Sequence, residues 1–374
     1  MLAFRWTLSA LLVVAFSYPA AAQEKDVGSG GWLKLFDGKT AFGWIDESKT
    51  LSVEEGVLVL KGGRATHSVS FPFFELEGEY QVTQDWRSVG FRRGDVTRGV
   101  LLRAGKEFSR FRLRFSETKL EFTDALDGTP RTETMTLHKE ERLFAVDLHC
   151  NKGQTVRFRS LKLRPLDMQS IFNGKDLTGW KAFPGKKSTF EVESGLLRVK
   201  DGPGDLQTEK KYGDFILQLE CKTNGKHLNS GVFFRCRDGE YQNGYEAQIR
   251  NQFTEGATQD YVIDEYDPMT RKLLDKKKIK STAVDFGTGA IYRRVPARIG
   301  VAKDGEWFTM TVAARSNHLA TWVDGIMVAD WHDWRPLSDN ARTGCRLEPG
   351  HISLQGHDPT TDLSFRNFRI VEYK

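Results

Sequence analysis

Polar side chains able to bind or act on a ligand are concentrated in the stretch 212–251, on two strand-like runs. The runs are Asn229-Ser230-Gly231-Val232-Phe233-Phe234-Arg235 and Gly244-Tyr245-Glu246-Ala247-Gln248-Ile249. Because side chains alternate between the faces of a strand, Glu246 and Gln248 point the same way, about 7 Å apart along it. Asn229 and Arg235 likewise share one face of the other run. Such a face is either solvated or the floor of a polar cleft, and the apolar residues between these positions are expected in a core.

The elements around this stretch belong to an internal repeat. The run Leu35–Trp44 (Leu-Phe-Asp-Gly-Lys-Thr-Ala-Phe-Gly-Trp) recurs as Ile171–Trp180 (Ile-Phe-Asn-Gly-Lys-Asp-Leu-Thr-Gly-Trp). Later runs match in the same order: 56–60 with 195–199, 98–103 with 230–235, and 156–163 with 363–370. We interpret the chain as a tandem duplication whose second copy carries an insertion, mostly after Ile249.

Short alternating runs separated by Gly, Asp and Asn turns predict an all-β protein. Examples are 215–220, 307–312 and 319–323, the last of which precedes an Asp-Gly turn. Many short strands at close spacing are typical of a β-sandwich or jelly roll. We expect one such unit at 31–165 and a second at 168–374. If runs 215–222 and 230–237 form a hairpin, Cys221 and Cys236 lie about 16 Å apart, beyond the reach of a disulfide.

The N-terminus has the features of an export signal. Arg5 precedes an apolar run from Leu8 to Phe16, which is followed by Ala20-Ala21-Ala22. This pattern predicts a signal peptide at 1–22 and a secreted or periplasmic protein, with an uncleaved anchor as the alternative. No transmembrane segment is expected after signal removal, because no other apolar stretch approaches spanning length.

Charge and cysteine usage exclude several classes of function. The formal net charge of +5 is small for 374 residues, and Lys and Arg are interspersed with acidic residues, so nucleic-acid binding is not expected. Cys150, Cys221, Cys236 and Cys345 fit neither a zinc nor a redox motif and are expected as buried small residues. The acidic residues at 260–267 fit no recognised calcium loop, so we expect a solvated loop there and no metal or other cofactor.

Taken together, the ordered motifs of the second copy resemble the 3-keto-disaccharide hydrolase family, whose members include 3-keto-glucoside lyases and hydratases. Besides the Phe-Asn-Gly-Lys…Gly-Trp opening, the resemblance rests on Tyr212-Gly213-Asp214-Phe215, Asn229-Ser230-Gly231, Gly244-Tyr245-Glu246-Ala247-Gln248, Gly289-Ala290-Ile291-Tyr292, Leu354-Gln355-Gly356-His357 and Phe365-Arg366-Asn367. It covers 168–374 well and 31–165 weakly. The resemblance implies two concanavalin-like jelly rolls and, as partner, a glycoside or oligosaccharide oxidised to a ketone at carbon 3.

The implied chemistry is abstraction of the proton on carbon 2, β-elimination of the glycosidic oxygen and addition of water. It requires a general base, a donor to the enolate oxygen and a proton for the leaving group. Under this resemblance Glu246 and His357 are the candidate acid and base, without a choice between their roles. The candidate substrate-binding residues are Asn229, Arg235, Gln248, Tyr292 and Gln355.

Each of these residues also has a structural interpretation. Arg235 could form an ion pair with Glu246 rather than bind substrate. His357 could cap the turn at Asp358, and Tyr292 could belong to the core. The first copy lacks the Gly-Tyr-Glu-x-Gln and Leu-Gln-x-His motifs altogether, which predicts an inactive unit that packs beside the second or presents substrate to it.

Two other functions remain compatible with the sequence. Jelly rolls serve lectins as readily as enzymes, so the chain could be a carbohydrate-binding protein of two modules without chemistry. A conventional glycoside hydrolase of this fold would instead need two carboxylates flanking the scissile bond. The run 246–251 offers only Glu246, which disfavours that alternative.

Overall fold

The structure is a computed structural model that describes residues 30–84, 86–93, 96–117, 119–126, 129–136, 144–255 and 259–373. The predicted signal at 1–22 lies outside these residues. The fold is all-β, as expected from the alternating runs, and the one short helical turn within these ranges is η1 (Val284–Phe286). No helix in the described part is long and apolar enough to cross a membrane.

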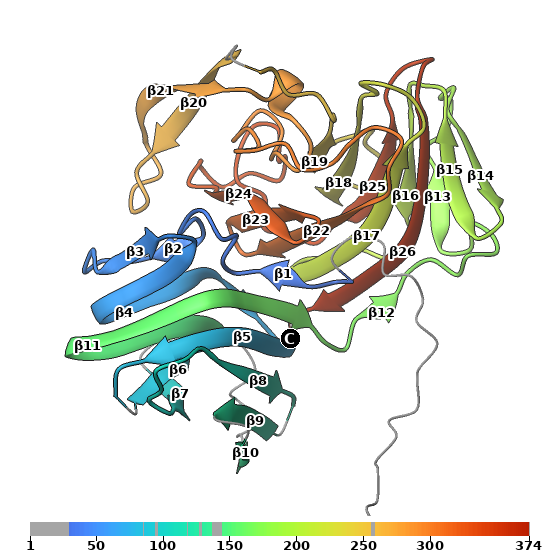
Figure 1. The fold of residues 1–374 in the computed structure, drawn as a ribbon. Coiled ribbons are helices and arrows are strands. Elements are labelled where there is room, and N and C mark those ends of the chain that lie inside the picture. Colours follow the sequence, from blue (N-terminus) through green and yellow to red (C-terminus); the bar gives the residue numbers. More distant parts are fainter. Residues whose placement is uncertain are drawn as a thin grey trace, which may run out of the picture.

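The first half of the chain pairs its strands in two groups (Figure 1). One group contains β1 (Leu33–Lys34), β3 (Leu51–Glu54), β5 (Phe74–Val82), β8 (Ser109–Phe115), β9 (Lys119–Leu126) and β10 (Thr129–Thr136). The other contains β2 (Trp44–Ile45), β6 (Trp86–Arg93) and β7 (Val96–Leu102). Two long strands, β4 (Val57–Phe71) and β11 (Phe144–Pro165), run through both groups, and β4 changes group at Gly62 and Gly63, both at positive φ.

The second half forms two separate sheets. The larger contains β12 (Gln169–Ser170), β14 (Thr189–Glu193), β15 (Leu196–Lys200), β17 (Phe215–Thr223), β22 (Phe308–Arg315), β23 (His318–Val323), β24 (Ile326–His332) and β26 (Asp362–Glu372). The smaller is ordered β13 (Trp180–Ala182), β16 (Gly204–Thr208), β25 (His351–Gly356), β18 (Ser230–Cys236) and β19 (Tyr245–Ile249). Strands β20 (Gln259–Tyr266) and β21 (Leu273–Ser281) form an exposed hairpin apart from both sheets.

The strand pairings of the two halves repeat each other. Strand β2 pairs with β4 as β13 pairs with β16, and the order β4–β11–β6–β7 in the first half corresponds to β16–β25–β18–β19 in the second. The two Trp residues of the repeat make the same contact: Trp44 Nε1 donates to Leu35 O at 2.6 Å and Trp180 Nε1 to Ile171 O at 2.8 Å. These parallels support the duplication inferred from sequence.

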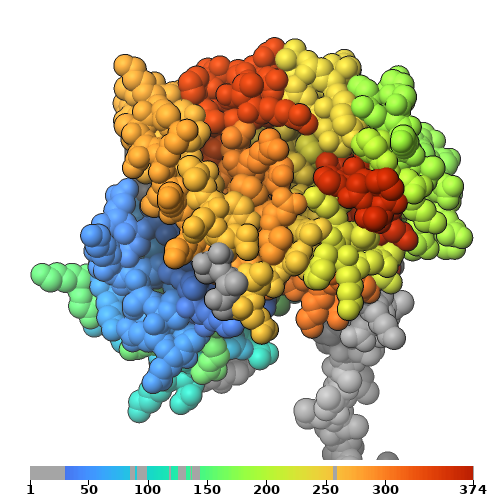
Figure 2. Space-filling model, turned by 90° about the horizontal axis from the view of Figure 1, so that it is seen from above, coloured from blue at the N-terminus to red at the C-terminus, as the bar shows by residue number. Residues whose placement is uncertain are grey.

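The halves are joined through β1 and through a shared core. Lys34 pairs in parallel with Ile326 of β24, and Leu33 pairs with Leu163 of β11, so β1 links the two larger sheets. The first core contains residues of both halves, whereas the second core lies within the second half. The residues that the second half contributes to the first core are Ile216, Ala313, Ala320, Trp322, Met327 and Val371. Figure 2 shows the blue N-terminal residues gathered at one side of the molecule, against the rest of the chain.

Three sequence expectations are wrong in detail. Runs 215–222 and 230–237 do not form a hairpin, because the segment between them crosses from one sheet to the other. The two strands instead face each other across the core, where the ring centroids of Phe215 and Phe234 are 6.0 Å apart. Strand β6, not 98–103, holds the place of β18. The acidic stretch at 260–267 is mostly strand β20 rather than a loop.

Candidate active site

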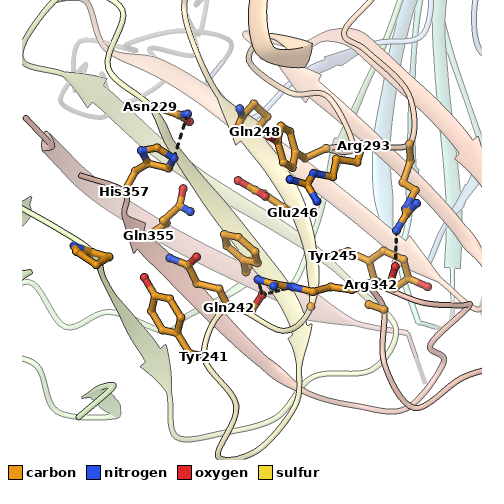
Figure 3. Close-up of a pocket in the computed structure, with 16 residues that line it drawn as sticks. Asn229, Tyr241, Gln242, Tyr245, Glu246, Gln248, Arg293, Arg342, Gln355 and His357 are labelled. Carbon is orange, nitrogen blue, oxygen red and sulfur yellow. Dashed lines mark hydrogen bonds between the residues drawn. The ribbon is translucent and has the colours of Figure 1, made fainter. Parts of the chain in front are cut away.

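A pocket of about 360 Å³ opens over the face of the smaller sheet that points away from the second core (Figure 3). Strands β18, β19 and β25 form its floor, and the loops around 241–244, 292–294 and 341–342 form its walls. The lining residues are Pro203, Asn229, Phe233, Tyr241, Gln242, Gly244, Tyr245, Glu246, Gln248, Tyr292, Arg293, Arg294, Ala341, Arg342, Gln355 and His357.

Strand alternation places the polar side chains on this floor. Val232, Ala247 and Leu354 are fully buried in the second core, so their neighbours along each strand point to the opposite face. Registers bring Phe233 opposite both Glu246 and Ser353. The expected division of these strands into an apolar and a polar face is therefore confirmed, and the polar face is a cleft floor.

Glu246 reaches across to the neighbouring strand and lies over Gly231. A Cβ atom at position 231 would stand 2.4 Å from Glu246 Oε1 and 2.8 Å from its Cγ, so only glycine leaves room for the carboxyl group. The pKa of Glu246 is raised to about 8, chiefly by desolvation; Arg342 and Arg293 lower it and nearby Asp285 raises it. A carboxyl group of this kind carries a proton at neutral pH and can donate it.

His357 follows β25 and is held by a carboxylate. Its Nδ1 lies 2.8 Å from Asp358 Oδ2, and its Nε2 lies 3.4 Å from Asn229 Nδ2. Because Asp358 can only accept and the Asn229 amide nitrogen can only donate, the neutral ring carries its proton on Nδ1 and has its lone pair on Nε2. The hydrogen bonds from Thr360 and His357 lower the pKa of Asp358, which therefore remains an acceptor. An imidazole oriented in this way can take up a proton at Nε2.

Asp285 organises the wall beside Asn229 and was not identified from the sequence. Its Oδ2 accepts a hydrogen bond from Asn229 Nδ2 at 2.9 Å, and its Oδ1 lies 3.5 Å from the Tyr292 hydroxyl. Its main-chain oxygen accepts a bond from Gln248 Nε2 at 3.0 Å. Asp285 adopts φ 52°, a conformation that is strained for residues with side chains. This strained residue fixes three of the predicted substrate-binding side chains.

Three glutamine side chains on the pocket lining are buried but have polar atoms without a hydrogen-bond partner in the described part of the chain. They are Gln248 Oε1, Gln355 Oε1 and Gln242 Nε2, on residues that are 1%, 6% and 8% exposed. A buried amide atom without a partner is costly unless a ligand or water satisfies it. The two oxygens are suited to accept hydrogen bonds from sugar hydroxyls.

The prediction that Arg235 binds substrate is wrong. Arg235 adopts φ 51° at an irregularity in the β18–β25 register, which turns its side chain away from the pocket. The guanidinium is fully buried, forms an ion pair with Asp214 at 2.8 Å and donates to the main-chain oxygens of Gly213, Ser316 and Arg346. It therefore pairs with Asp214 rather than with Glu246, and it ties β18 to the surrounding loops.

The other predicted residues are brought together: Glu246, His357, Asn229, Gln248, Tyr292 and Gln355 all line the pocket. The residues missed from the sequence are Asp285, Asp358, Tyr241, Gln242, Arg293 and Arg342. Most lie on loops outside the motifs and carried no periodic signal. Asp358 could have been found, because it directly follows His357. Among the described residues, no group of His, Cys, Asp or Glu is arranged to hold a metal ion.

Comparison with known proteins places this pocket in a family. A model of the 3-keto-alpha-glucoside-1,2-lyase-like domain matches residues 167–371. Among solved structures, two candidate glycosyl hydrolases from Parabacteroides distasonis ATCC 8503 are 22% and 23% identical. Each covers 55% of this chain and 94% or 100% of its own, with TM-scores of 0.41 and 0.40. The carbohydrate-binding module CBM66 from Bacillus subtilis is 13% identical, covering 54% of this chain and 99% of that one, with a TM-score of 0.32.

No curated protein matches the chain. The matched segment 167–371 contains every strand that forms the pocket floor, and its limits agree with the resemblance seen in the motifs of the second copy. Because this segment spans more than half of the chain, the protein belongs to the 3-keto-alpha-glucoside-1,2-lyase-like family.

Proposed function

We propose that the second half of the chain cleaves glycosides whose sugar is already a ketone at carbon 3. The carbonyl acidifies the hydrogen on carbon 2, so a base can remove that proton and leave an enediolate. The enediolate then collapses: the ketone reforms, a double bond forms between carbons 1 and 2, and the glycosidic oxygen departs with a proton from an acid. Addition of water across this double bond makes the sum a hydrolysis.

One observation carries this proposal: a protonated carboxyl group and a carboxylate-oriented imidazole line the same pocket. Glu246, whose pKa burial raises to about 8, acts as the acid that protonates the departing oxygen. His357, with its Nε2 lone pair facing the pocket, acts as the base that removes the proton from carbon 2. In the hydration step the two residues exchange roles, as in other acid–base pairs.

The remaining lining residues bind the sugar. One Asn229 N–H stays bonded to Asp285, and the other leaves His357 Nε2 when substrate binds and donates to the carbonyl oxygen where negative charge develops. The unpartnered oxygens of Gln248 and Gln355 accept hydrogen bonds from ring hydroxyls. Tyr292 is held against Asp285 and closes one side of the pocket.

The direct test is turnover of a chromogenic ketone substrate. The protein lacking residues 1–22 is incubated with 4-nitrophenyl 3-keto-β-D-glucoside, and nitrophenol release is followed together with the absorbance of the unsaturated ketone. The matched control is unoxidised 4-nitrophenyl β-D-glucoside, whose carbon 2 hydrogen is not acidic and which should not react. Release from the ketone alone would support elimination, and release from both would indicate conventional hydrolysis.

The alternative of a non-catalytic carbohydrate-binding protein predicts a different result. It predicts saturable binding of the ketone substrate, measured by calorimetry, without any turnover. The unpartnered glutamine oxygens are compatible with both functions, whereas the raised pKa of Glu246 favours catalysis.

Export to the periplasm or the medium is part of the same proposal. The residues that carry it are Arg5, the run 8–16 and the alanines at 20–22. Mass spectrometry of the protein recovered from an exporting host should give a chain that begins at Gln23. A chain that retains Met1 and stays with the membrane fraction would support the uncleaved anchor instead.

A further inference from the structure

One wall of the pocket is made of cationic side chains. Arg293, Arg294 and Arg342 line it, and none of the ion pairs formed by the described residues includes any of the three. Glu246 is the only carboxylic acid among the lining residues. Because burial raises its pKa to about 8, it is neutral at physiological pH and does not balance these charges. The wall therefore has an excess of positive charge.

Two of the three arginines are held by main-chain contacts rather than by carboxylates, and Arg293 lies over the Tyr292 ring, 5.4 Å from its centroid. Arg342 donates from Nε and Nη2 to Gln242 O at 3.0 and 2.5 Å, and Arg294 Nη2 donates to Arg342 O at 2.9 Å. Because these bonds use carbonyl oxygens, they orient the guanidinium groups without neutralising them. Burial lowers the pKa of Arg294 to about 10, at which it still carries its charge at neutral pH.

A buried donor independently indicates that an acceptor belongs here. Gln242 is 8% exposed and lines the pocket, and no described residue accepts a well-formed hydrogen bond from its Nε2, although its side chain interacts with the neighbouring Tyr241 hydroxyl. In Figure 3, Asn229 and His357 lie above and to the left of Glu246, Gln242 and Arg342 lie below it, and Arg293 lies above and to its right. The pocket thus has two ends, one with amides and an imidazole and the other dominated by donors.

We propose that this donor-rich end binds an anionic group of the carbohydrate, a carboxylate or a sulfate ester, through Arg293, Arg342 and the Gln242 amide nitrogen. Guanidinium groups bind both anions through charge-assisted hydrogen bonds. The inference rests on the proposed function in that the ligand is a sugar bound in the same pocket. It makes acidic glycosides the preferred substrate class.

Binding of inert, unoxidised sugars tests the anion site separately from catalysis. Calorimetry compares methyl β-D-glucuronide with methyl β-D-glucoside, which differ only at carbon 6, and methyl β-D-glucoside 6-sulfate serves as the sulfate arm. We expect the protein to bind at least one of the two anionic sugars about tenfold more tightly than the neutral sugar. The arm with the greater advantage identifies the anion.

Substitutions locate the site. Arg342→Gln and Arg293→Gln should each weaken binding of the preferred anionic sugar about tenfold, the effect expected for one lost charge-assisted hydrogen bond. Arg293→Lys should retain part of the advantage, because it keeps the charge. Lys200→Gln, an exposed residue of β15 that does not line the pocket, removes the same charge and should leave the advantage unchanged.

Equal affinity for the anionic and neutral sugars would overturn the inference, as would an equal loss of affinity in Lys200→Gln. The two proposals fail separately. Turnover of the neutral ketone substrate without any preference for an anionic group refutes only the anion site. Tight, arginine-dependent binding of the glucuronide or the sulfate without turnover of any ketone substrate supports the site and refutes the enzymatic proposal.

Discussion

The two halves of the molecule share a pattern of strand pairing. They differ in the residues at equivalent positions of the smaller sheet of the second half and of strands β4, β11, β6 and β7 in the first half. Aligning the pairs Trp44–His67 and Trp180–Thr208 makes Leu148 and Val89 equivalent to Leu354 and Val232, all buried. On the opposite face of these strands, the polar residues of the second half are replaced in the first half. The correspondences are Glu246 with Gly99, Gln248 with Leu101, Gln355 with His149, Ser353 with Asp147 and Asp205 with Arg64. The residues that face the core are apolar in both halves, whereas the residues on the opposite face differ.

The difference shows which property separates a site from a surface. In the first half, Arg64 and Asp147 form an ion pair with Nε 3.1 Å from Oδ2, and the Thr66 hydroxyl donates to Asp147 Oδ1 at 2.7 Å, so the charges on this face balance each other. In the second half, Gln248, Gln355 and Gln242 keep buried polar atoms without partners. We propose that the first half is not catalytic, because its equivalent face lacks both the carboxyl group and the unpartnered amides.

The outer faces of the larger sheets differ as well. In the second half this face carries apolar residues such as Trp322 and Met327, which pack into the core of the first half. In the first half it carries Arg110 and Arg112, which pair with Glu79 and Glu75 at 3.0 and 2.8 Å. One face is covered by protein and the other faces water, so the first half also serves as a cover for the second.

The largest effect is expected from removing the acid. Glu246→Gln should lower kcat/KM for a 3-keto disaccharide by about 10²–10⁴-fold, because a departing sugar alkoxide, unlike nitrophenolate, needs the proton donor that is lost. The matched control is His149→Gln, which places in the first half the amide that the second half has at 355. It should leave turnover unchanged, and a loss of activity there as large as in Glu246→Gln would refute the division of labour between the halves.

The next largest effect is expected at the contact between the two halves, in the first core. Trp322 is fully buried in the first core, so Trp322→Ala should lower the free energy of unfolding by about 3–5 kcal/mol. Chemical denaturation followed by circular dichroism should also show one transition for both halves in the parent protein. Two separate transitions, with only one of them moved by the substitution, would show that the shared core does not couple the halves.

The fold class and most of the pocket floor could be predicted from the sequence because strand alternation sets both. Once 245–249 is a strand with Ala247 inside, Glu246 and Gln248 must face outward together. The internal repeat could also be recognised from the sequence, because both copies begin with the same Gly-Trp motif. Periodicity carries no information on which strands pair, however, so the 215–222 and 230–237 runs were joined wrongly.

The prediction for Arg235 failed because of its local backbone conformation. Alternation assumes a regular strand, and the positive φ at 235 breaks the alternation just before the strand ends. The pocket walls were also beyond reach, since Asp285, Gln242 and Arg342 come from loops that only the folded chain brings together. Their spacing in the sequence has no relation to their spacing in the pocket.

A smaller effect on activity is expected from substituting Gly231, because the side chain of Glu246 on the next strand fills the space beside this glycine. Gly231→Ala would put a methyl group 2.4 Å from the present position of Glu246 Oε1, so the carboxyl group must move. A displacement of this size should lower kcat/KM by about 10–100-fold. Gly225→Ala is the control, because its added carbon meets Leu228 at an ordinary 3.4 Å. Equal effects of the two substitutions would mean that Gly231 does not position the acid.

The same carboxyl group should make stability depend on pH, an effect absent at the equivalent Gly99. The pKa of Glu246 is about 8 in the folded protein, because of burial, against 4.5 for an exposed glutamate. The folded state therefore holds this proton more tightly, and the resulting stabilisation is complete below pH 4.5 and is lost as the pH rises through 8. Glu246→Gln should thus become more stable relative to the parent by about 2 kcal/mol between pH 6.5 and pH 9, measured by urea unfolding. A constant difference would refute the raised pKa.

The smallest effect is expected on the water-facing sheet of the first half. The Arg110 side chain is 84% exposed, so its ion pair with Glu79 is screened by solvent, and Arg110→Gln should lower the free energy of unfolding by less than about 1 kcal/mol. The difference should shrink further in 1 M NaCl, because screening weakens exposed charge pairs. Since Trp322 occupies the corresponding outer face of the other half, the two substitutions compare a covered with an uncovered sheet. A salt-independent loss above 2 kcal/mol would mean that the Arg110 face is also buried, by a second copy of the chain or by another partner.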